Sequence, residues 1–210
     1  MPSSTQTAPT VFVVDDDISV RESLHQLIGC AGFRPECFAC GNDFLVHPRA
    51  DEPSCLLLDV NLPDLNGLDL QKQVAADRSE MPIIFITGCA DVAVTVRAMK
   101  AGAAEFLLKP FKDDVLLAAI EQAIERSRAA LQAANEMRLL KNRYATLTPR
   151  EREVMSLVAS GLLNKQVAGE LGLSEVTVKG HRGKVTHKMK ARTVSSLLSM
   201  AAKLGLPGPR

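Results

Sequence analysis

Residues 55–70 read CLLLDVNLPDLNGLDL. The apolar run at the start of this stretch is bounded by a polar residue, which is typical of a strand buried on both faces. Asp59 follows the run directly, and apolar residues then recur with helical spacing over 68–76. The stretch therefore predicts a strand, a loop that begins with a carboxylate, and a helix.

The same pattern recurs along the first half of the chain. Further apolar runs stand at 11–14, at 82–87 and, more weakly, at 36–38 and 105–108. Segments with helical spacing lie between the runs, at 19–30, 68–76 and 91–101. Strands that alternate with helices predict an α/β domain, with a parallel sheet covered by helices on both faces.

Polar residues stand where the predicted strands end. In open parallel sheets, ligands bind at the carboxyl ends of the strands. The residues at these ends are Asp15, Asp16 and Asp17 after the run at 11–14, then Asp59, Thr87 and Lys109. We therefore expect several carboxylates, a hydroxyl and a lysine to meet at one edge of the sheet.

This acidic edge has the composition of a site for phosphoryl transfer. Crowded carboxylates repel one another unless a cation neutralises them, and the hard ion Mg2+ prefers oxygen ligands. Thr87 and Lys109 would donate to the oxygens of an anion, and Asp59 would be the nucleophile. The alternative, for any one aspartate taken singly, is that it only caps a loop or a helix.

The second half of the chain is predicted to be helical throughout. Residues 113–143 contain no Gly or Pro. They predict one long helix, whose more polar second half leaves the first domain as a linker. Thr148, Pro149 and Glu151 match an N-cap, a first helical position and a capping box. Helices are expected at 148–160, 165–171, 174–189 and 193–204, and the tight turn between the middle two is typical of a helix-turn-helix.

Charge is divided unevenly between the two halves. Residues 145–210 carry 11 Lys and Arg against 4 Asp and Glu, a net charge of +7, whereas residues 1–144 carry a net −6. A basic module joined to an acidic one indicates a nucleic-acid partner for the basic module. RNA-binding modules usually offer stacking aromatic residues. Tyr144 is the only Phe, Tyr or Trp after Phe111, which favours DNA.

The motifs VFVVDDD, CLLLDVNLPDLNGLDL, PIIFITG and AGAAEFLLKPF make residues 10–125 resemble the receiver domain of two-component response regulators. The resemblance implies a flavodoxin-like parallel sheet of five strands in the order 2-1-3-4-5. It implies that a sensor histidine kinase phosphorylates Asp59. It also implies a Mg2+ site formed by Asp16, Asp59 and the backbone carbonyl of Asn61, with Asp15 acting mainly through water.

The resemblance assigns further roles around the phosphoryl group. Thr87 and Lys109 would contact its oxygens, and Phe106 stands at the position of a rotating aromatic residue that reports the state of Thr87. The Lys109–Pro110 bond would be cis on family grounds, although most X–Pro bonds are trans.

A phospho-aspartyl enzyme is the main rival to a regulator. Phosphatases of the haloacid dehalogenase type need a second aspartate two residues after the nucleophile, as a general acid and base. Asn61 occupies that position and cannot titrate. The sequence therefore predicts a stored signal, and not an enzyme.

Residues 145–204 resemble the LuxR-type DNA-binding domain of the FixJ/NarL regulators, through LTPREREVMSLVASGLLNKQVAGELGLSEVTVKGHRGKVTHKM. The predicted organisation is then a receiver at 10–125, a helical linker at 126–144 and a helix-turn-helix domain at 145–210. By position, the resemblance places these residues at or beside DNA: Asn164, Lys165, Ser174, Thr177, Lys179, Gly180, His181 and Lys184.

Two glycines depart from the pattern of many relatives. Gly180 and Gly183 lie inside the predicted recognition helix, where each costs up to ~1 kcal/mol of helix stability relative to Ala. They also remove two side chains from the groove-facing region. Base reading is thereby left open, whereas DNA binding could depend on phosphate contacts and dimerisation.

The combined prediction is a response regulator that binds double-stranded promoter DNA when phosphorylated and regulates transcription, as an activator acting with RNA polymerase. The resemblance implies a homodimer of the phosphorylated form. Its receivers would pair through 91–101, 105–108 and the helix from 113, and its DNA-binding domains through 193–204.

Other sequence signals are weak or absent. No apolar run approaches the ~20 residues that span a bilayer, and no signal peptide is recognisable, which predicts a cytoplasmic protein with no membrane partner. The five cysteines, an odd number, argue against a disulfide framework. Cys37 and Cys40 form a C-x-x-C without a second pair, so core or loop cysteines are favoured over a redox or metal site.

Overall fold

The computed structural model describes residues 8–49, 52–88 and 91–207. Its strands are β1 (Thr10–Val14), β2 (Arg34–Phe38), β3 (Ser54–Asp59), β4 (Ile83–Thr87) and β5 (Glu105–Leu108). All four neighbouring pairs are parallel, in the order β2-β1-β3-β4-β5. The predicted fold class and strand order are confirmed.

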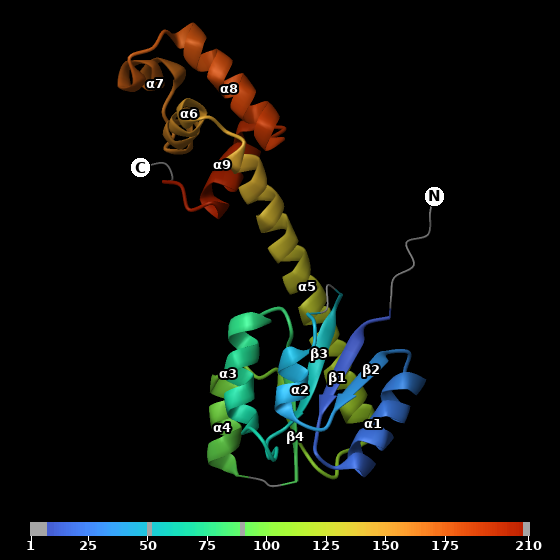
Figure 1. Cartoon of the computed structure of the whole chain (residues 1–210). Coiled ribbons are helices and arrows are strands. Elements are labelled where there is room, and N and C mark those ends of the chain that lie inside the picture. Colours follow the sequence, from blue (N-terminus) through green and yellow to red (C-terminus); the bar gives the residue numbers. More distant parts are fainter. Residues whose placement is uncertain (1–7, 50–51, 89–90, 208–210) are drawn as a thin grey trace. The chain divides into compact units, whose positions relative to one another are not determined.

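Helices cover both faces of the sheet (Figure 1). The helices of this part of the chain are α1 (Ile18–Cys30), α2 (Gly41–Val46), α3 (Gly67–Asp77), α4 (Val92–Lys100) and α5 (Asp113–Ala145). One apolar cluster joins the sheet to α2, α3 and α4, and a second joins it to α1 and the first half of α5. Alternate residues of each strand enter opposite clusters, since successive strand side chains point to opposite faces.

The central strands form the most deeply buried part of the molecule. Every residue of β1, β3 and β4 is buried. This explains why these strands appear in the sequence as continuous apolar runs rather than as alternating patterns. Asp59 and Thr87, the last residues of β3 and β4, are themselves part of this buried set.

Two elements differ from the sequence prediction. The sequence predicts a strand at 36–38, whereas β2 begins at Arg34 and includes Pro35. Strand β2 pairs only with β1, so it lies at the edge of the sheet, and an edge strand tolerates a proline. Helix α2 was not predicted at all, because it has only 6 residues and begins with a glycine. Its start is held by Asp64, whose carboxylate accepts hydrogen bonds from the N–H groups of Gly41 and Asn42.

The chain divides into two compact units, residues 1–132 and 133–210, and the division falls within α5. The second unit contains the end of α5, followed by α6 (Pro149–Ala159), α7 (Asn164–Leu171), α8 (Glu175–Met189) and α9 (Val194–Lys203). These bounds match the predicted helices to within one or two residues. Thr148 caps α6, and the predicted capping box with Glu151 is present.

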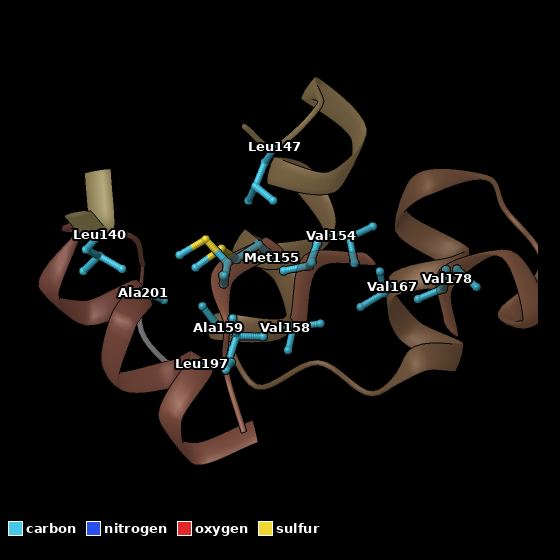
Figure 2. Packing of buried hydrophobic residues seen from close by; sticks show 14 residues of the cluster. Leu140, Leu147, Val154, Met155, Val158, Ala159, Val167, Val178, Leu197 and Ala201 are labelled. Atoms are coloured by element: carbon cyan, nitrogen blue, oxygen red, sulfur yellow. The ribbon is translucent and has the colours of Figure 1, made fainter. Parts of the chain in front are cut away.

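The second unit has a hydrophobic core of its own. Figure 2 shows buried side chains from α5 to α9 pointing into one cluster. Leu140 belongs to α5, Val154 and Val158 to α6, Val167 to α7 and Val178 to α8. The end of α5 therefore contributes to the helical domain as well as joining it to the sheet domain.

Candidate functional site

The Asp59 carboxylate lies at the carboxyl edge of the sheet and is largely enclosed. Asp59 ends β3 and is only 8% exposed. Its Oδ1 accepts a hydrogen bond from the N–H of Asn61 at 3.2 Å, and its Oδ2 accepts one from Lys109 Nζ at 3.1 Å. One carboxylate oxygen is thus held by the following loop, and the other by the residue after β5.

Lys109 also contacts a second carboxylate. Its Nζ lies 2.5 Å from Asp15 Oδ2, and Asp15 is fully buried. The other oxygen of Asp15 accepts from the N–H of Asp17 at 3.0 Å. The ends of three strands, β1, β3 and β5, therefore meet at this ammonium, as the sequence predicts.

The charge state of Lys109 follows from its two partners. Burial of its side chain alone would lower the pKa of the ammonium. The hydrogen bond and charge of Asp15, and then those of Asp59, outweigh burial and raise the pKa above its usual value. Lys109 is therefore a fixed positive charge at neutral pH.

Asp16 completes an acidic cluster with Asp15 and Asp59. One carboxylate oxygen from each of the three lies within 4.8 Å of the others, and Asp16 is exposed whereas its partners are buried. Lys109 Nζ contacts two of these three carboxylates, those of Asp15 and Asp59, so the cluster holds more acidic groups than this one ammonium pairs with. Oxygen ligands with this charge fit a divalent ion such as Mg2+.

Thr87 and Phe106 occupy neighbouring strands. Thr87 ends β4 and is 1% exposed, and its carbonyl accepts from the N–H of Lys109 at 2.7 Å. Phe106 lies in β5, is half-buried, and its ring centroid is 6.0 Å from that of Phe85. The Lys109–Pro110 peptide bond is cis.

The second functional surface is built on α7 and α8. The turn between these helices places Gly172 at φ 63°, a left-handed conformation that favours glycine. Ser174 caps α8 by accepting from the N–H of Thr177 at 3.1 Å. Val178, Val185 and Met189 face the core, whereas the opposite face of α8 is exposed to solvent.

Most of the residues predicted to bind DNA lie on this surface. The exposed ones are Lys165, Ser174, Thr177, Lys179, Gly180 and Lys184. Asn164 and His181 are half-buried. Asn164 Oδ1 accepts a hydrogen bond from Arg182 Nη1, which joins the start of α7 to the middle of α8.

Known proteins resemble the chain over both units. Residues 11–121 match the response regulator receiver domain, and residues 145–201 match the luxR family of bacterial regulatory proteins. The chain belongs to the LuxR-type response regulators.

Relatives of this response regulator match it along nearly its full length. Nodulation protein W of Bradyrhizobium diazoefficiens is 50% identical, over 95% of this chain and 88% of that protein. The transcriptional regulatory protein FixJ of the same organism is 39% identical, over 93% and 96%. The solved structure of the response regulator StyR has 47% identity and a TM-score of 0.83, and covers 94% of this chain and 100% of that one. The predicted family and function, a phosphorylation-controlled regulator of transcription that binds DNA, are thereby confirmed.

The structure adds residues of the regulator that sequence reasoning missed. A Cβ atom at Gly67 would lie 2.5 Å from the carbonyl oxygen of Asp59, so only glycine allows the loop after β3 to close against that strand. Arg21 donates from Nη1 to the carbonyl oxygen of Asp15 at 2.7 Å and so holds the end of β1. Gly67 lies within the motif CLLLDVNLPDLNGLDL, but nothing in the local sequence indicates that its backbone approaches Asp59 so closely.

One basic residue of α8 has an internal partner. Lys188 Nζ lies 2.6 Å from Glu151 Oε2, and Glu151 is only 3% exposed. The hydrogen bond from Lys188, followed by that from the N–H of Thr148, lowers the pKa of the Glu151 carboxyl. Lys188 is a basic residue in the last turn of the recognition helix, yet this contact assigns it to the fold of the domain.

Cys37 and Cys40 have the character of unreactive thiols. Burial, opposed by the charge of Arg21, raises the pKa of Cys37. At Cys40 the N–H of Asp43 lowers the thiol pKa, but burial and the carboxylates of Asp43 and Asp64 outweigh it and raise the pKa. A raised pKa leaves little thiolate at neutral pH, which favours a structural role. Cys89 lies outside the described residues.

Within the described residues, no helix is both long enough and apolar enough to cross a bilayer.

Proposed function

We propose that Asp59 is the phospho-acceptor of this response regulator. The observation that carries the proposal is the position of its carboxylate, 8% exposed, 3.1 Å from Lys109 Nζ and clustered with Asp15 and Asp16. A carboxylate oxygen of Asp59 attacks the phosphorus of a phosphohistidine on the sensor kinase. The P–N bond breaks, the imidazole nitrogen takes up a proton, and an aspartyl phosphate forms.

The residues around Asp59 have separate proposed roles. Asp15, Asp16, Asp59 and the backbone carbonyl of Asn61 would hold Mg2+, which when bound neutralises charge on the phosphoryl oxygens. Lys109 supplies a fixed positive charge on the other side, as its contacts with both buried carboxylates support. Thr87 would donate its hydroxyl proton to a phosphoryl oxygen, and Phe106 would reorient with it.

Acetyl phosphate labelling tests this assignment. The wild-type chain, incubated with acetyl phosphate and Mg2+, should acquire one acid-stable and base-labile phosphate, and Asp59→Asn should acquire none. Asp17→Asn is the matched control, because Asp17 caps α1 at the same edge and asparagine caps equally well. Normal labelling of the Asp59→Asn chain would overturn the assignment.

Phosphorylation is proposed to produce a homodimer through α4, β5 and the start of α5. Large apolar side chains exposed on these elements support this surface: Val92, Val96, Met99, Leu108 and Val115. Helix α9 would pair the DNA-binding domains. The mass of the chain in solution, measured by light scattering with and without acetyl phosphate, should double on phosphorylation; an unchanged mass would contradict the dimer.

The output is proposed to be promoter binding that activates transcription together with RNA polymerase. Binding would use Asn164, Lys165, Ser174, Thr177, Lys179, Gly180, His181 and Lys184, and most of these residues lie exposed on α7 and α8. The domains would be a receiver at 10–125, a linker at 126–144 and a DNA-binding domain at 145–210. Access to the chromosome requires a cytoplasmic location. We assign no enzymatic activity to this regulator.

Transcription in a reconstituted system tests the output. A promoter controlled by the regulator, supplied with RNA polymerase, should give more transcript with the phosphorylated wild-type chain than with Asp59→Asn. Equal transcript from the two chains would contradict control by phosphorylation, and less transcript with the wild type would indicate a repressor.

A further inference from the structure

The face of the recognition helix α8 that points away from the core carries almost no polar side chain. Val176, Gly180, Gly183 and His187 are spaced by four, three and four residues, so they form one stripe along the helix. All four are exposed, and Val178, Val185 and Met189 hold the opposite face in the core. We call these four residues the outer stripe.

The fold does not require either glycine of the outer stripe. Neither Gly180 nor Gly183 has a positive φ, and a Cβ atom added at either would meet nothing within 4 Å. By contrast, Gly67 has no room for a Cβ, and Gly172 has a φ of 63°. A mid-helix glycine without such a reason only weakens the helix relative to alanine.

Val176 is the most exposed of the large apolar side chains described in the helical domain. It lies in the first turn of α8 and is 81% exposed, so it adds nothing to the core. A short branched apolar side chain at the start of a recognition helix can contact the methyl group of thymine, which projects into the major groove.

Positive charges flank the outer stripe. Helical geometry places Lys179 on one side of the stripe and Lys184 on the other, and both are exposed. Side chains in these positions can reach the phosphates on the two sides of a groove, while the stripe between them faces the base edges.

We propose that the outer stripe is the sequence-reading surface of this regulator, and that it reads by close approach rather than by long polar side chains. Gly180 and Gly183 let the helix backbone lie against the base edges, where a Cβ atom would hold it away. Val176 contacts a thymine methyl group beside them. The inference rests on DNA binding by the LuxR-type domain and deepens it, because it names the residues that select the sequence.

Alanine substitution distinguishes a glycine that folding requires from a glycine that DNA binding requires. The probe is a duplex enriched from a random library by the full wild-type chain after treatment with acetyl phosphate and Mg2+. Gly180→Ala and Gly183→Ala should each raise the thermal unfolding midpoint, and each should weaken binding to this duplex about tenfold. Gly169→Ala is the matched control, because Gly169 is an exposed glycine of α7 with the same open surroundings. It should raise the midpoint and leave affinity unchanged.

Replacing thymine by uracil tests the valine contact. One thymine in one half of the enriched duplex, when changed to uracil, should weaken wild-type binding about fourfold, the effect of one buried methyl-sized group. The same change should leave the affinity of Val176→Ala unaltered. A thymine-to-uracil effect of equal size in both chains would remove Val176 from the proposal.

The outcomes also separate this inference from DNA binding itself. If the wild-type chain enriches a duplex and the two glycine variants bind it as tightly as the wild type, the close-approach proposal is overturned and DNA binding stands. If the wild-type chain enriches no duplex, the DNA-binding function and this inference both fail.

Discussion

The ammonium of Lys188 donates a hydrogen bond to Glu151 Oε2 across 2.6 Å and so ties the last turn of α8 to the first turn of α6. The same carboxylate accepts from the N–H of Thr148 at 2.9 Å, through the capping box. A single buried side chain therefore fixes the start of one helix and the position of another. The contact between Lys188 and Glu151 therefore helps to position the recognition helix, although neither residue belongs to the outer stripe.

Glu151→Gln should destabilise the helical domain by about 1–3 kcal/mol at pH 7, because the ion pair with Lys188 is replaced by a hydrogen bond from the ammonium to a neutral acceptor. The midpoint of denaturant unfolding measures the change. Glu153→Gln is the control, since Glu153 is exposed and pairs with Arg150 of its own helix; it should change stability by less than about 0.5 kcal/mol. Equal losses in the two variants would contradict the role of the Lys188 contact.

The contribution of Glu151 should depend on pH with a definite sign. Its pKa in the folded domain lies below the value in the unfolded chain. The stabilisation is therefore present above the unfolded pKa and is lost as pH falls through the folded pKa. The stability difference between wild type and Glu151→Gln should shrink on acidification below about pH 4.5, the ordinary range for a glutamate. A difference that is constant down to pH 3 would contradict the assignment.

Gly67→Ala should disturb the loop that holds Asp59. The added Cβ would meet the carbonyl oxygen of Asp59 at 2.5 Å, so the loop must move, at a cost of about 1–3 kcal/mol. We expect a lower unfolding midpoint and a slower reaction with acetyl phosphate. Gly29→Ala in α1 has open surroundings, and it should stabilise the chain and label normally. Normal labelling of Gly67→Ala would mean that the loop adapts without moving Asp59.

Lys109→Met should bind Mg2+ more tightly and react more slowly. In the structure the Lys109 ammonium contacts the Asp15 and Asp59 oxygens that would also ligate the ion, so its removal leaves them to the cation alone. We expect about tenfold tighter Mg2+ binding, measured by the ion's effect on the unfolding midpoint. Phosphorylation should be slower, because one positive charge is missing from the transition state. Weaker Mg2+ binding would show that the ammonium organises the carboxylates instead of competing for them.

Arg78→Lys should destabilise the receiver by about 2–4 kcal/mol, although charge is conserved. The buried Arg78 guanidinium donates to the carbonyl oxygens of Phe44, Leu45 and His47 and lies over the Phe44 ring at 4.6 Å. All three contacts are made by Nη2, and a lysine ammonium lacks the planar guanidinium that carries this nitrogen while lying over the Phe44 ring. Arg126→Lys, on an exposed site of α5, is the control and should be nearly neutral in chemical denaturation. A neutral Arg78→Lys would indicate that α2 is held by other contacts.

The acidic site was predictable because its position follows from a local rule. Asp15, Asp59 and Thr87 each stand at the end of a buried apolar run, and parallel strands bring such ends together. Helix α2 and the full extent of β2 were not predictable in this way. A helix of 6 residues that begins at Gly41 is too short to show helical periodicity. Pro35 is rare in strands, so the sequence around it does not indicate that β2 begins at Arg34.

The amino-acid sequence by itself determined the elements apart from α2 and the full extent of β2, their order, the family and the set of residues at the sheet edge, because periodicity, capping and strand-end chemistry are local properties. Only the tertiary structure decided which of those groups are in contact. Lys109 bridging Asp15 and Asp59, Gly67 closing on the Asp59 carbonyl, and Lys188 turned inward to Glu151 all join residues separated along the chain. Their distances depend on how helices and strands pack, and packing is set by the whole core rather than by any local stretch.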